Sequence, residues 1–389
     1  MSGYRGLHRE TSPASSEAIP IWHIATSPLL SKASKNTSSS WRIWSACGTG
    51  QVRSYVVQEK GLQQDVLDAS ACSCDLSTIF IGASQTSKEA KATKLDPALS
   101  CSQVRVARNY VGDDDNAGDV IVASLSLSGK VRLWSCSETL DDDASTDNKD
   151  SNPTFQQAAQ EFQVEQATGT MLQVCPPNTS GVGDVVVAVA CLDGSVAMVA
   201  SGMVTPKCTK EPTAAGTILE TWSKSSSIAL CGDWHPSKKQ LAVGRQDGLV
   251  EILGGKPHRL VQHEAPVRAI TFTPDGHLLI SASDDGMLCV WDVTRPIPVL
   301  VNHVVQAHGS WILSITPLSD SRRVVTSGAD GQIHVWSVGQ LDQPLHTFSS
   351  DDMAWSIHAM KTTKGPNSLP PRLVSGSEKG TIQIYSLEA

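Results

Sequence analysis

A glycine followed by an alternating apolar pattern recurs seven times along this chain, and it limits the folds open to the sequence. In every copy the second residue after the glycine is aliphatic. The fourth is also apolar in every copy except at Ser54. Apolar alternation with a period of two is typical of a β-strand with one strongly buried face. The seven turn glycines are Gly50, Gly129, Gly194, Gly248, Gly286, Gly331 and Gly380.

The fifth copy is the clearest, over residues 263–292. It holds the runs VRAITF, HLLISAS and MLCVWD, joined by the turns at 274–276 and 284–286, and it reads as an antiparallel meander. One such meander cannot bury its own faces, so the copies must pack on each other. Successive glycines near the end of the chain are 38, 45 and 49 residues apart, close to the repeat length of β-propellers. No long segment shows a period of 3.6 residues. We therefore expect an all-β fold, a single seven-bladed propeller of four-stranded antiparallel blades spanning 1–389.

The wider spacings in the first half indicate insertions. Residues 84–97 and 138–152 are rich in small, polar and charged side chains, and we expect flexible surface loops there. The last copy ends close to residue 389 after only three strands. The segment 2–8 is the natural source of the missing strand, and we expect it to close the ring by completing the last blade.

Composition narrows the function. The net charge of −8 argues against a nucleic-acid-binding surface that acts through overall charge. No stretch has the order of a signal peptide or the length of a membrane span, so a cytoplasmic or nuclear location is expected. The ten cysteines are scattered without zinc-ligand spacing. Because Cys47 and Cys191 fall at one strand position of separate repeats, buried reduced thiols are expected rather than disulfides.

At 286–292 and 331–337 the sequence resembles the WD-repeat family of β-propellers. The Trp-Asp pair is present at Trp291-Asp292, and at Trp336-Ser337 a serine stands in place of the aspartate. In that family a loop His, a strand Ser or Thr, a turn Asp and the Trp form a buried hydrogen-bonded set. The resemblance implies two such structural sets: His263, Ser281, Asp285 and Trp291 in one blade, and His308, Thr326, Asp330 and Trp336 in the next. Asp193 and Asp247 keep the acid, but those blades lack the Trp and are expected to rely on apolar packing.

Longer stretches resemble a smaller family, the WD-repeat subunits of the superkiller complex, which also serve in the polymerase-associated factor complex. These stretches are VRAITFTPDGHLLISASDDGMLCVWDV, HGSWILSI, DDMAWSI and the final IQIYSLEA. The first half departs from that family through its insertions. The resemblance implies a scaffold that holds a tetratricopeptide-repeat subunit and an RNA helicase supporting exosome-dependent 3′–5′ mRNA decay. The propeller itself would be monomeric within the hetero-complex, with no direct contact to nucleic acid or membrane.

The start of the first strand of each blade is expected to face the narrow rim of the central channel. Aligned strands place Trp22, Arg268, Leu313 and Trp355 in one column, and Pro20, Pro266, Trp311 and Met353 in a second. Tryptophan and arginine dominate binding hot spots. The tryptophans could instead pack between blades. We predict a partner-binding rim at Trp22, Pro266, Arg268, Trp311, Met353 and Trp355.

Catalysis is the weaker interpretation. His235, His263 and His308 occur near Asp and Ser, but no nucleophile motif and no Gly-rich phosphate loop accompanies them. We therefore expect no catalytic, cofactor-binding or metal-binding residues. A propeller enzyme would place polar or metal-binding side chains in the channel, whereas a nuclear-pore scaffold subunit, a ubiquitin-ligase substrate receptor or a transcription-elongation subunit would share the aromatic rim.

Overall fold

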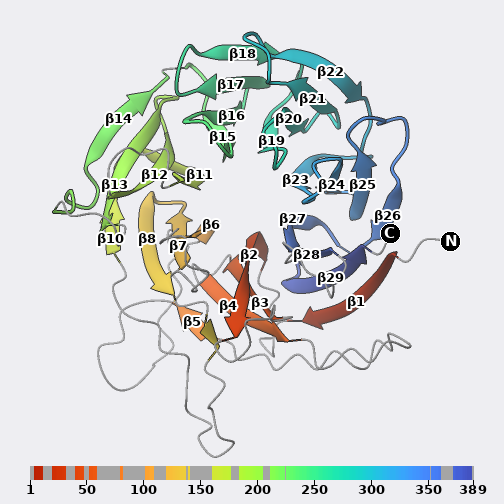
Figure 1. Cartoon of the computed structure of the whole chain (residues 1–389), viewed down its shortest axis with the longest axis horizontal. Coiled ribbons are helices and arrows are strands. Elements are labelled where there is room, and N and C mark those ends of the chain that lie inside the picture. The colour runs from red at the N-terminus through yellow and green to blue at the C-terminus, as the bar shows by residue number, and fades with distance from the viewer. Residues whose placement is uncertain are drawn as a thin grey trace, which may run out of the picture.

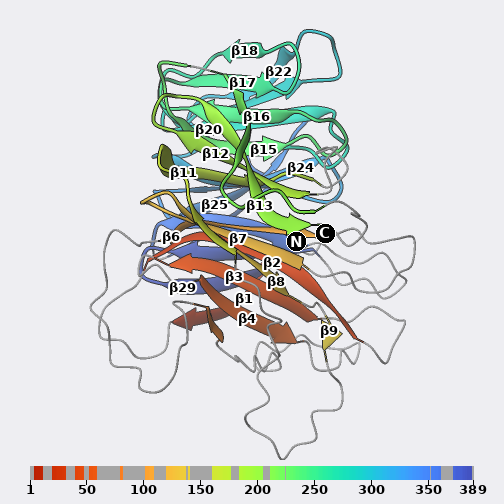
Figure 2. The ribbon, with the colours of Figure 1, turned by 90° about the vertical axis from the view of Figure 1, so that its left-hand side faces the viewer.

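A computed structural model describes the chain at residues 4–11, 20–31, 40–47, 52–58, 79–81, 101–108, 120–136, 139–140, 160–176, 184–204, 211–223, 225–350, 352–360 and 371–387. Within these ranges the regular elements are all strands, grouped into sheets that follow one another around a central opening (Figure 1). Seen from the side, the sheets form a thick disc (Figure 2). The fold is an all-β propeller with four-stranded antiparallel blades, as the repeats predict.

Six sheets have four strands in an antiparallel order. Five of them use strands that are consecutive or nearly so in the sequence. They contain β6 (Cys101–Arg108), β7 (Val120–Ser126), β8 (Lys130–Cys136) and β10 (Gln160–Gln163); β11 (Ala167–Val174), β12 (Asp184–Cys191), β13 (Val196–Val204) and β14 (Ile218–Trp222); β15 (Ala229–Trp234), β16 (Leu241–Arg245), β17 (Leu249–Leu253) and β18 (His258–Val261); β19 (Val267–Phe272), β20 (Leu278–Ser283), β21 (Leu288–Asp292) and β22 (Val299–Val304); and β23 (Ile312–Pro317), β24 (Arg323–Gly328), β25 (Gln332–Ser337) and β26 (His346–Ser349).

The sixth four-stranded sheet joins the two ends of the described chain. Strands β27 (Ala354–Met360), β28 (Arg372–Ser377) and β29 (Thr381–Leu387) are followed at the edge by β1 (Tyr4–Thr11). Strand β1 runs antiparallel to β29, with Tyr4 opposite Leu387 and Thr11 opposite Thr381. The N-terminal segment thus lies where the sequence predicts it, although the strand extends three residues past the predicted end at His8.

The remaining sheet differs from the prediction because it has five strands. It contains β2 (Ile21–Ser31), β3 (Ser40–Cys47), β4 (Val52–Gln58), β5 (Ile79–Ile81) and β9 (Thr139–Leu140). Strand β9 pairs in parallel with the end of β2, with Thr139 opposite Leu30. The prediction of a loop throughout 138–152 is therefore wrong at residues 139–140, because unpaired backbone at the end of the long strand β2 provides hydrogen-bonding partners for them. The rest of that insertion, and all of 84–97, lies outside the described residues.

The core lies between neighbouring sheets, not within any one of them. One cluster joins Ile280 and Val290 to Ile312, Val324 and Trp336 of the next blade. Both faces of the central strands are consequently covered: every residue of β7 and every residue of β28 is buried. The alternation in the sequence predicted one buried face. The second face is buried as well because each blade packs against a neighbour on both sides.

The repeated glycines form the turns that connect the strands. Six of the seven predicted turn glycines lie in the described ranges, and all six have positive φ angles, between 73° and 86°. Residues with a side chain rarely adopt this conformation. Gly248 has the largest of these φ angles, 86°. A Cβ at this position would lie 2.5 Å from the carbonyl oxygen of His263.

Replacing Gly248 with alanine should therefore destabilise the propeller by about 2 kcal/mol through backbone strain and the clash with His263. Gly255→Ala is the matched control, because a Cβ at Gly255 would meet nothing within 4 Å. Urea unfolding followed by tryptophan fluorescence measures both. Equal midpoints for the two variants would contradict the role assigned to the turn.

Candidate functional site

The inner strands share one irregularity at the mouth of the central channel. In six of them the pairing register shifts between the first and the third residue of the strand. A β-bulge leaves one residue unpaired and changes the direction of its side chain. The bulged positions are Trp22, Ser102, Leu230, Arg268, Leu313 and Trp355.

Four of these bulged residues form the first column predicted from the sequence: Trp22, Arg268, Leu313 and Trp355. All four line a cavity of about 260 Å³ in the centre of the ring. The inner strands β2, β6, β11, β15, β19, β23 and β27 each contribute to its wall. The sequence alignment missed Leu230, which lies at the same position of β15. The register shift explains the column: the extra residue cannot pair in the ladder, so its side chain is directed to the channel mouth.

Two aromatic contacts form the rim. The rings of Trp22 and Trp355 stack with their centroids 5.9 Å apart, although they belong to different sheets. The guanidinium of Arg268 lies 5.5 Å from the ring centroid of Trp311, and its Nε donates to Oδ1 of Asp284 at 2.6 Å. Trp22 remains 37% exposed and Trp311 50% exposed. Packing between blades therefore buries part of the Trp22 and Trp355 rings. Trp22 and Trp311 still expose a large aromatic surface to water.

The second predicted column does not line the cavity; it lies beside it on backbone that is held in place. The carbonyl oxygens of Pro266, Trp311 and Met353 accept hydrogen bonds from the N–H groups of Asp284, Ala329 and Glu378, at 3.0, 2.9 and 3.2 Å. Pro266 and Met353 are half-buried. Among these three, only Trp311 presents a large exposed side chain.

The structure brings together the first predicted polar set. His263 contacts Oδ2 of Asp285 through Nδ1 at 3.1 Å and Oγ of Ser281 through Nε2 at 2.8 Å. The indole N–H of Trp291 donates to the same Ser281 oxygen at 3.0 Å. The set links the loop before β19 to strands β20 and β21, and it satisfies every polar atom involved.

The next blade repeats this arrangement. His308 Nδ1 lies 3.1 Å from Oδ1 of Asp330, its Nε2 lies 2.8 Å from Oγ1 of Thr326, and Trp336 donates to Thr326 at 2.9 Å. His334 lies against this set, with its ring centroid 4.4 Å from that of His308. His308, Asp330 and His334 offer nitrogen and oxygen atoms within 4.8 Å of one another. They are the residues in the described ranges that could hold a metal ion, although both nitrogens of His308 already have partners.

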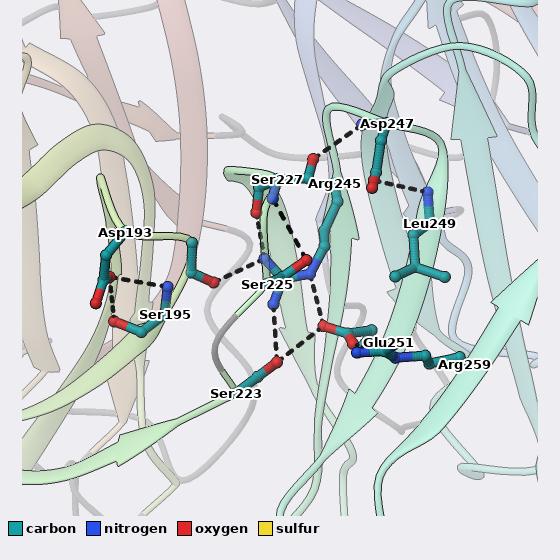
Figure 3. Close-up of polar contacts among 11 residues, drawn as sticks. Asp193, Ser195, Ser223, Ser225, Ser227, Arg245, Asp247, Leu249, Glu251 and Arg259 are labelled. Atoms are coloured by element: carbon teal, nitrogen blue, oxygen red, sulfur yellow. Dashed lines mark hydrogen bonds and ion pairs between the residues drawn. The ribbon is translucent and has the colours of Figure 1, made fainter.

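The blade formed by β15–β18 replaces the missing set with a buried ion pair (Figure 3). Arg245 donates through Nε to Oε2 of Glu251 at 2.6 Å, and the two side chains are 0% and 1% exposed. An Nη of Arg245 also donates to the carbonyl oxygens of Gly194 and Ser227, at 2.8 and 2.6 Å. This blade has the apolar packing that the sequence predicts, through buried residues such as Leu241 and Val250, but the ion pair was not predicted. An isolated charge cannot be buried without partners, and here Glu251 and the neighbouring blade's turn provide them.

The blade with Asp193 follows the expectation more closely. Oδ1 of Asp193 accepts a hydrogen bond from the Ser195 N–H at 3.0 Å, within its own turn. The faces of this blade are dominated by buried aliphatic residues such as Val187 and Val199.

A half-buried arginine that lines the cavity was not predicted, because the strand that carries it, β6, fell outside the runs recognised in the sequence. Arg105 donates through Nε to the carbonyl oxygen of Leu172 at 3.2 Å. Burial lowers its pKa, and the nearby Asp233 raises it. Burial raises the pKa of Asp233, whose carboxylate accepts from the N–H of Phe272 at 2.8 Å. The alternation in CSQVRVAR was the available signal for β6.

The histidines considered for a hydrolytic triad are all engaged in structural bonds. His235 Nδ1 accepts from the N–H groups of Ser237 and Lys238, each at 3.1 Å, and its Nε2 lies 3.1 Å from the Gly276 carbonyl oxygen. His263 and His308 belong to the polar sets. The cysteines Cys175, Cys191, Cys231 and Cys289 are buried, and burial raises the pKa of Cys231 and of Cys289 to about 12. In the described part of the chain no helix is long and apolar enough to cross a membrane.

Comparison with known proteins agrees with this architecture. The family model "WD domain, G-beta repeat" matches residues 254–292 and 300–337. The chain is 27% identical over 110 residues to the protein LST8 homolog of Drosophila melanogaster, covering 26% of this chain and 35% of that protein. It is 32% identical over 116 residues to human WD repeat and SOCS box-containing protein 1, covering 27% of each. It is 25% identical over 188 residues to mouse WD repeat-containing protein 90, covering 47% of this chain and 9% of that protein.

Each of these alignments spans about a third of the relative or less. Together the matched repeats and the WD-repeat relatives support a WD-repeat β-propeller family for this chain. That fold is typically non-catalytic, and its members generally act as protein-interaction scaffolds. The relatives are diverse, and none of the three points to the superkiller complex.

Glu251→Ala should destabilise the protein by about 3 kcal/mol, because Arg245 would remain buried without its carboxylate. Arg259→Ala is the matched control. Arg259 donates to the other oxygen of Glu251 at 3.1 Å, but its side chain is 63% exposed, so its loss should cost under about 1 kcal/mol. The double variant Arg245→Met with Glu251→Leu should recover most of the loss. Urea unfolding of the three variants tests this, and a tolerant Glu251→Ala variant would show that the pair is dispensable.

Acid should weaken the blade that contains Asp330. Burial opposes ionisation of this carboxyl group, yet hydrogen bonds from His308 and from the Gln332 N–H lower its pKa from 3.8 to about 2. A lowered pKa stabilises the fold above about pH 4, and this stability is lost as the pH falls towards 2, by roughly 2 kcal/mol. Asp330→Asn should be less stable than wild type at pH 6 and should lose less on acidification. Parallel pH dependence of the urea midpoints in the two proteins would refute this role.

Proposed function

We propose that this WD-repeat propeller is a non-catalytic scaffold that binds a segment of a partner protein across the rim of its channel. The observation that carries the proposal is the exposure of Trp22 and Trp311 around the mouth of the cavity, next to Arg268. Buried area at such residues contributes most of the affinity of protein interfaces. Pro266, Met353 and Trp355 complete the proposed surface.

The more specific proposal is that the chain is the WD-repeat subunit of a superkiller complex, supporting exosome-dependent 3′–5′ mRNA decay. Its partners would be a tetratricopeptide-repeat subunit and an RNA helicase, and it would act in the cytoplasm, in the nucleus or in both. The stretches from VRAITF to the final IQIYSLEA support this assignment through their resemblance to that family. Another WD-repeat adaptor is the alternative.

We also propose that the five-stranded sheet is the seventh blade of one domain over 1–389. Its inner strand β2 lies beside β27: the Ile24 N–H donates to Oγ of Ser356 at 2.9 Å, and Oγ1 of Thr26 lies 2.8 Å from Nδ1 of His358. Its residues Trp22 and Ile24 line the same cavity as the inner strands of the six other blades. These contacts support a closed ring in which β9 is an addition to the blade.

Affinity purification of the tagged chain with mass spectrometry tests the assignment. Recovery of a helicase together with a tetratricopeptide-repeat protein supports the superkiller proposal. Recovery of nucleoporins or cullin components in their place would replace it with another adaptor function.

Trp311→Ala and Trp355→Ala should each weaken binding of the recovered partner by about 2 kcal/mol, roughly 30-fold in affinity, because each removes aromatic contact area at the rim. Leu345→Ala is the control: this side chain is 53% exposed but precedes the outer strand β26. Binding is measured in pull-downs and by calorimetry, after circular dichroism has shown that the variants are folded. Full binding by both folded tryptophan variants would exclude the rim as the interface.

A further inference from the structure

The cavity behind the aromatic rim is lined by basic side chains, which the rim alone does not explain. Two arginines, Arg105 and Arg268, and two histidines, His23 and His358, line it, and none of the described residues that line it is an Asp or a Glu. Burial lowers the pKa of His23 well below its usual value, so this ring is neutral at physiological pH. The charge of Arg268 is offset by Asp284 at 2.6 Å. Of the two arginines in the wall, Arg105 is therefore the one that lacks a close carboxylate among the described residues.

Arg105 is only partly satisfied. A guanidinium has five N–H groups to donate. Here Nε donates to Leu172, and Nη2 lies 3.5 Å from Oε1 of Gln103, at the limit of a hydrogen bond. Among the described residues no carboxylate forms an ion pair with it. Asp233 attracts it, but that carboxylate is held by the Phe272 N–H and by Oγ1 of Thr271, and it does not line the cavity.

The guanidinium is within reach of the channel mouth. Arg105 lies three residues beyond the bulged Ser102 on β6, which is roughly 10 Å along an extended strand. Its Nη2 lies 3.5 Å from Oε1 of Gln103, which is two residues nearer the rim on β6 and also lines the cavity. An acidic side chain entering between the Trp22–Trp355 pair and the Arg268–Trp311 pair would approach this end of Arg105.

We propose that the partner inserts one glutamate or aspartate into this cavity and that its carboxylate binds Arg105. The proposal rests on the proposed function and specifies the chemistry of the partner segment: an acidic residue flanked by large apolar residues that lie on the rim tryptophans. A cavity of about 260 Å³ is below the usual size of small-molecule pockets, roughly 300–1,000 Å³, and it suits one or two side chains. Because Asp233 offsets part of the local charge, a singly charged carboxylate fits better than a doubly charged phosphate.

The probe for this proposal is a displayed library of random 12-residue peptides selected against the full chain. The selected peptides should share an Asp or Glu with a large apolar residue within a few positions. For the tightest peptide, Arg105→Gln should weaken binding 10- to 100-fold, the range of hydrogen bonds to a charged group, measured by fluorescence anisotropy. Replacing the peptide's acid with its amide should weaken binding similarly. The two changes together should cost no more than one alone, because they remove the same contact.

The controls separate this proposal from the function on which it rests. Arg295→Gln removes an arginine that is 62% exposed and pairs with Asp292 away from the cavity, and it should leave binding unchanged. Thermal unfolding identifies variants that lose affinity through misfolding; if Arg105→Gln does not fold, the acid-to-amide peptide still decides the matter. If the peptides require Trp311 and Trp355 but bind equally well with the amide, the carboxylate does not bind Arg105. The rim would then remain the proposed binding surface. Tighter binding after the acid is replaced with phosphoserine would also overturn it. Binding that survives both tryptophan substitutions would instead overturn the proposed function.

Discussion

The fold depends on the packing of one sheet against the next. A four-stranded meander cannot bury either of its two apolar faces by itself. Each blade is therefore stable only when neighbouring blades cover both faces. One cluster joins β19, β20 and β21 to β23, β24 and β25, and another joins β7, β8 and β10 to β11, β12 and β13. Pairing of β1 with β29 covers an edge of the last blade that would otherwise be exposed.

Polar contacts hold the blades in register in more than one way. In the blades that contain Trp291 and Trp336, a histidine connects the turn aspartate to a strand hydroxyl that also accepts the indole N–H. In the blade of β15–β18, Arg245 reaches back to Gly194 in the preceding blade and pairs with Glu251 in its own. The first arrangement ties a loop to its blade, and the second ties two blades together. Both place buried polar atoms where each has a partner, which is the condition for burying them.

The register shift shared by the inner strands builds the candidate site. The second residue of six inner strands is left out of the ladder, and five of these residues, Trp22, Leu230, Arg268, Leu313 and Trp355, line the central cavity. Three of them are Trp22, Arg268 and Trp355, which combine apolar surface with a cation. A binding surface therefore arises from single residues on different blades, and no blade carries it alone.

Much of this protein follows from local sequence rules. The turn glycines and the apolar alternation after them predicted the strand that follows each turn, the four-stranded antiparallel blades and the position of the N-terminal strand, because turn conformation and burial on alternate positions are local properties. The same alignment placed the rim column at Trp22, Arg268, Leu313 and Trp355. Tertiary structure alone decided the parallel addition of β9, the stacking of Trp22 on Trp355, the ion pair of Arg245 with Glu251 and the position of Arg105 in the cavity. Each of these joins residues from separate strands or blades, and no spacing along one strand encodes which side chains meet when a ring closes.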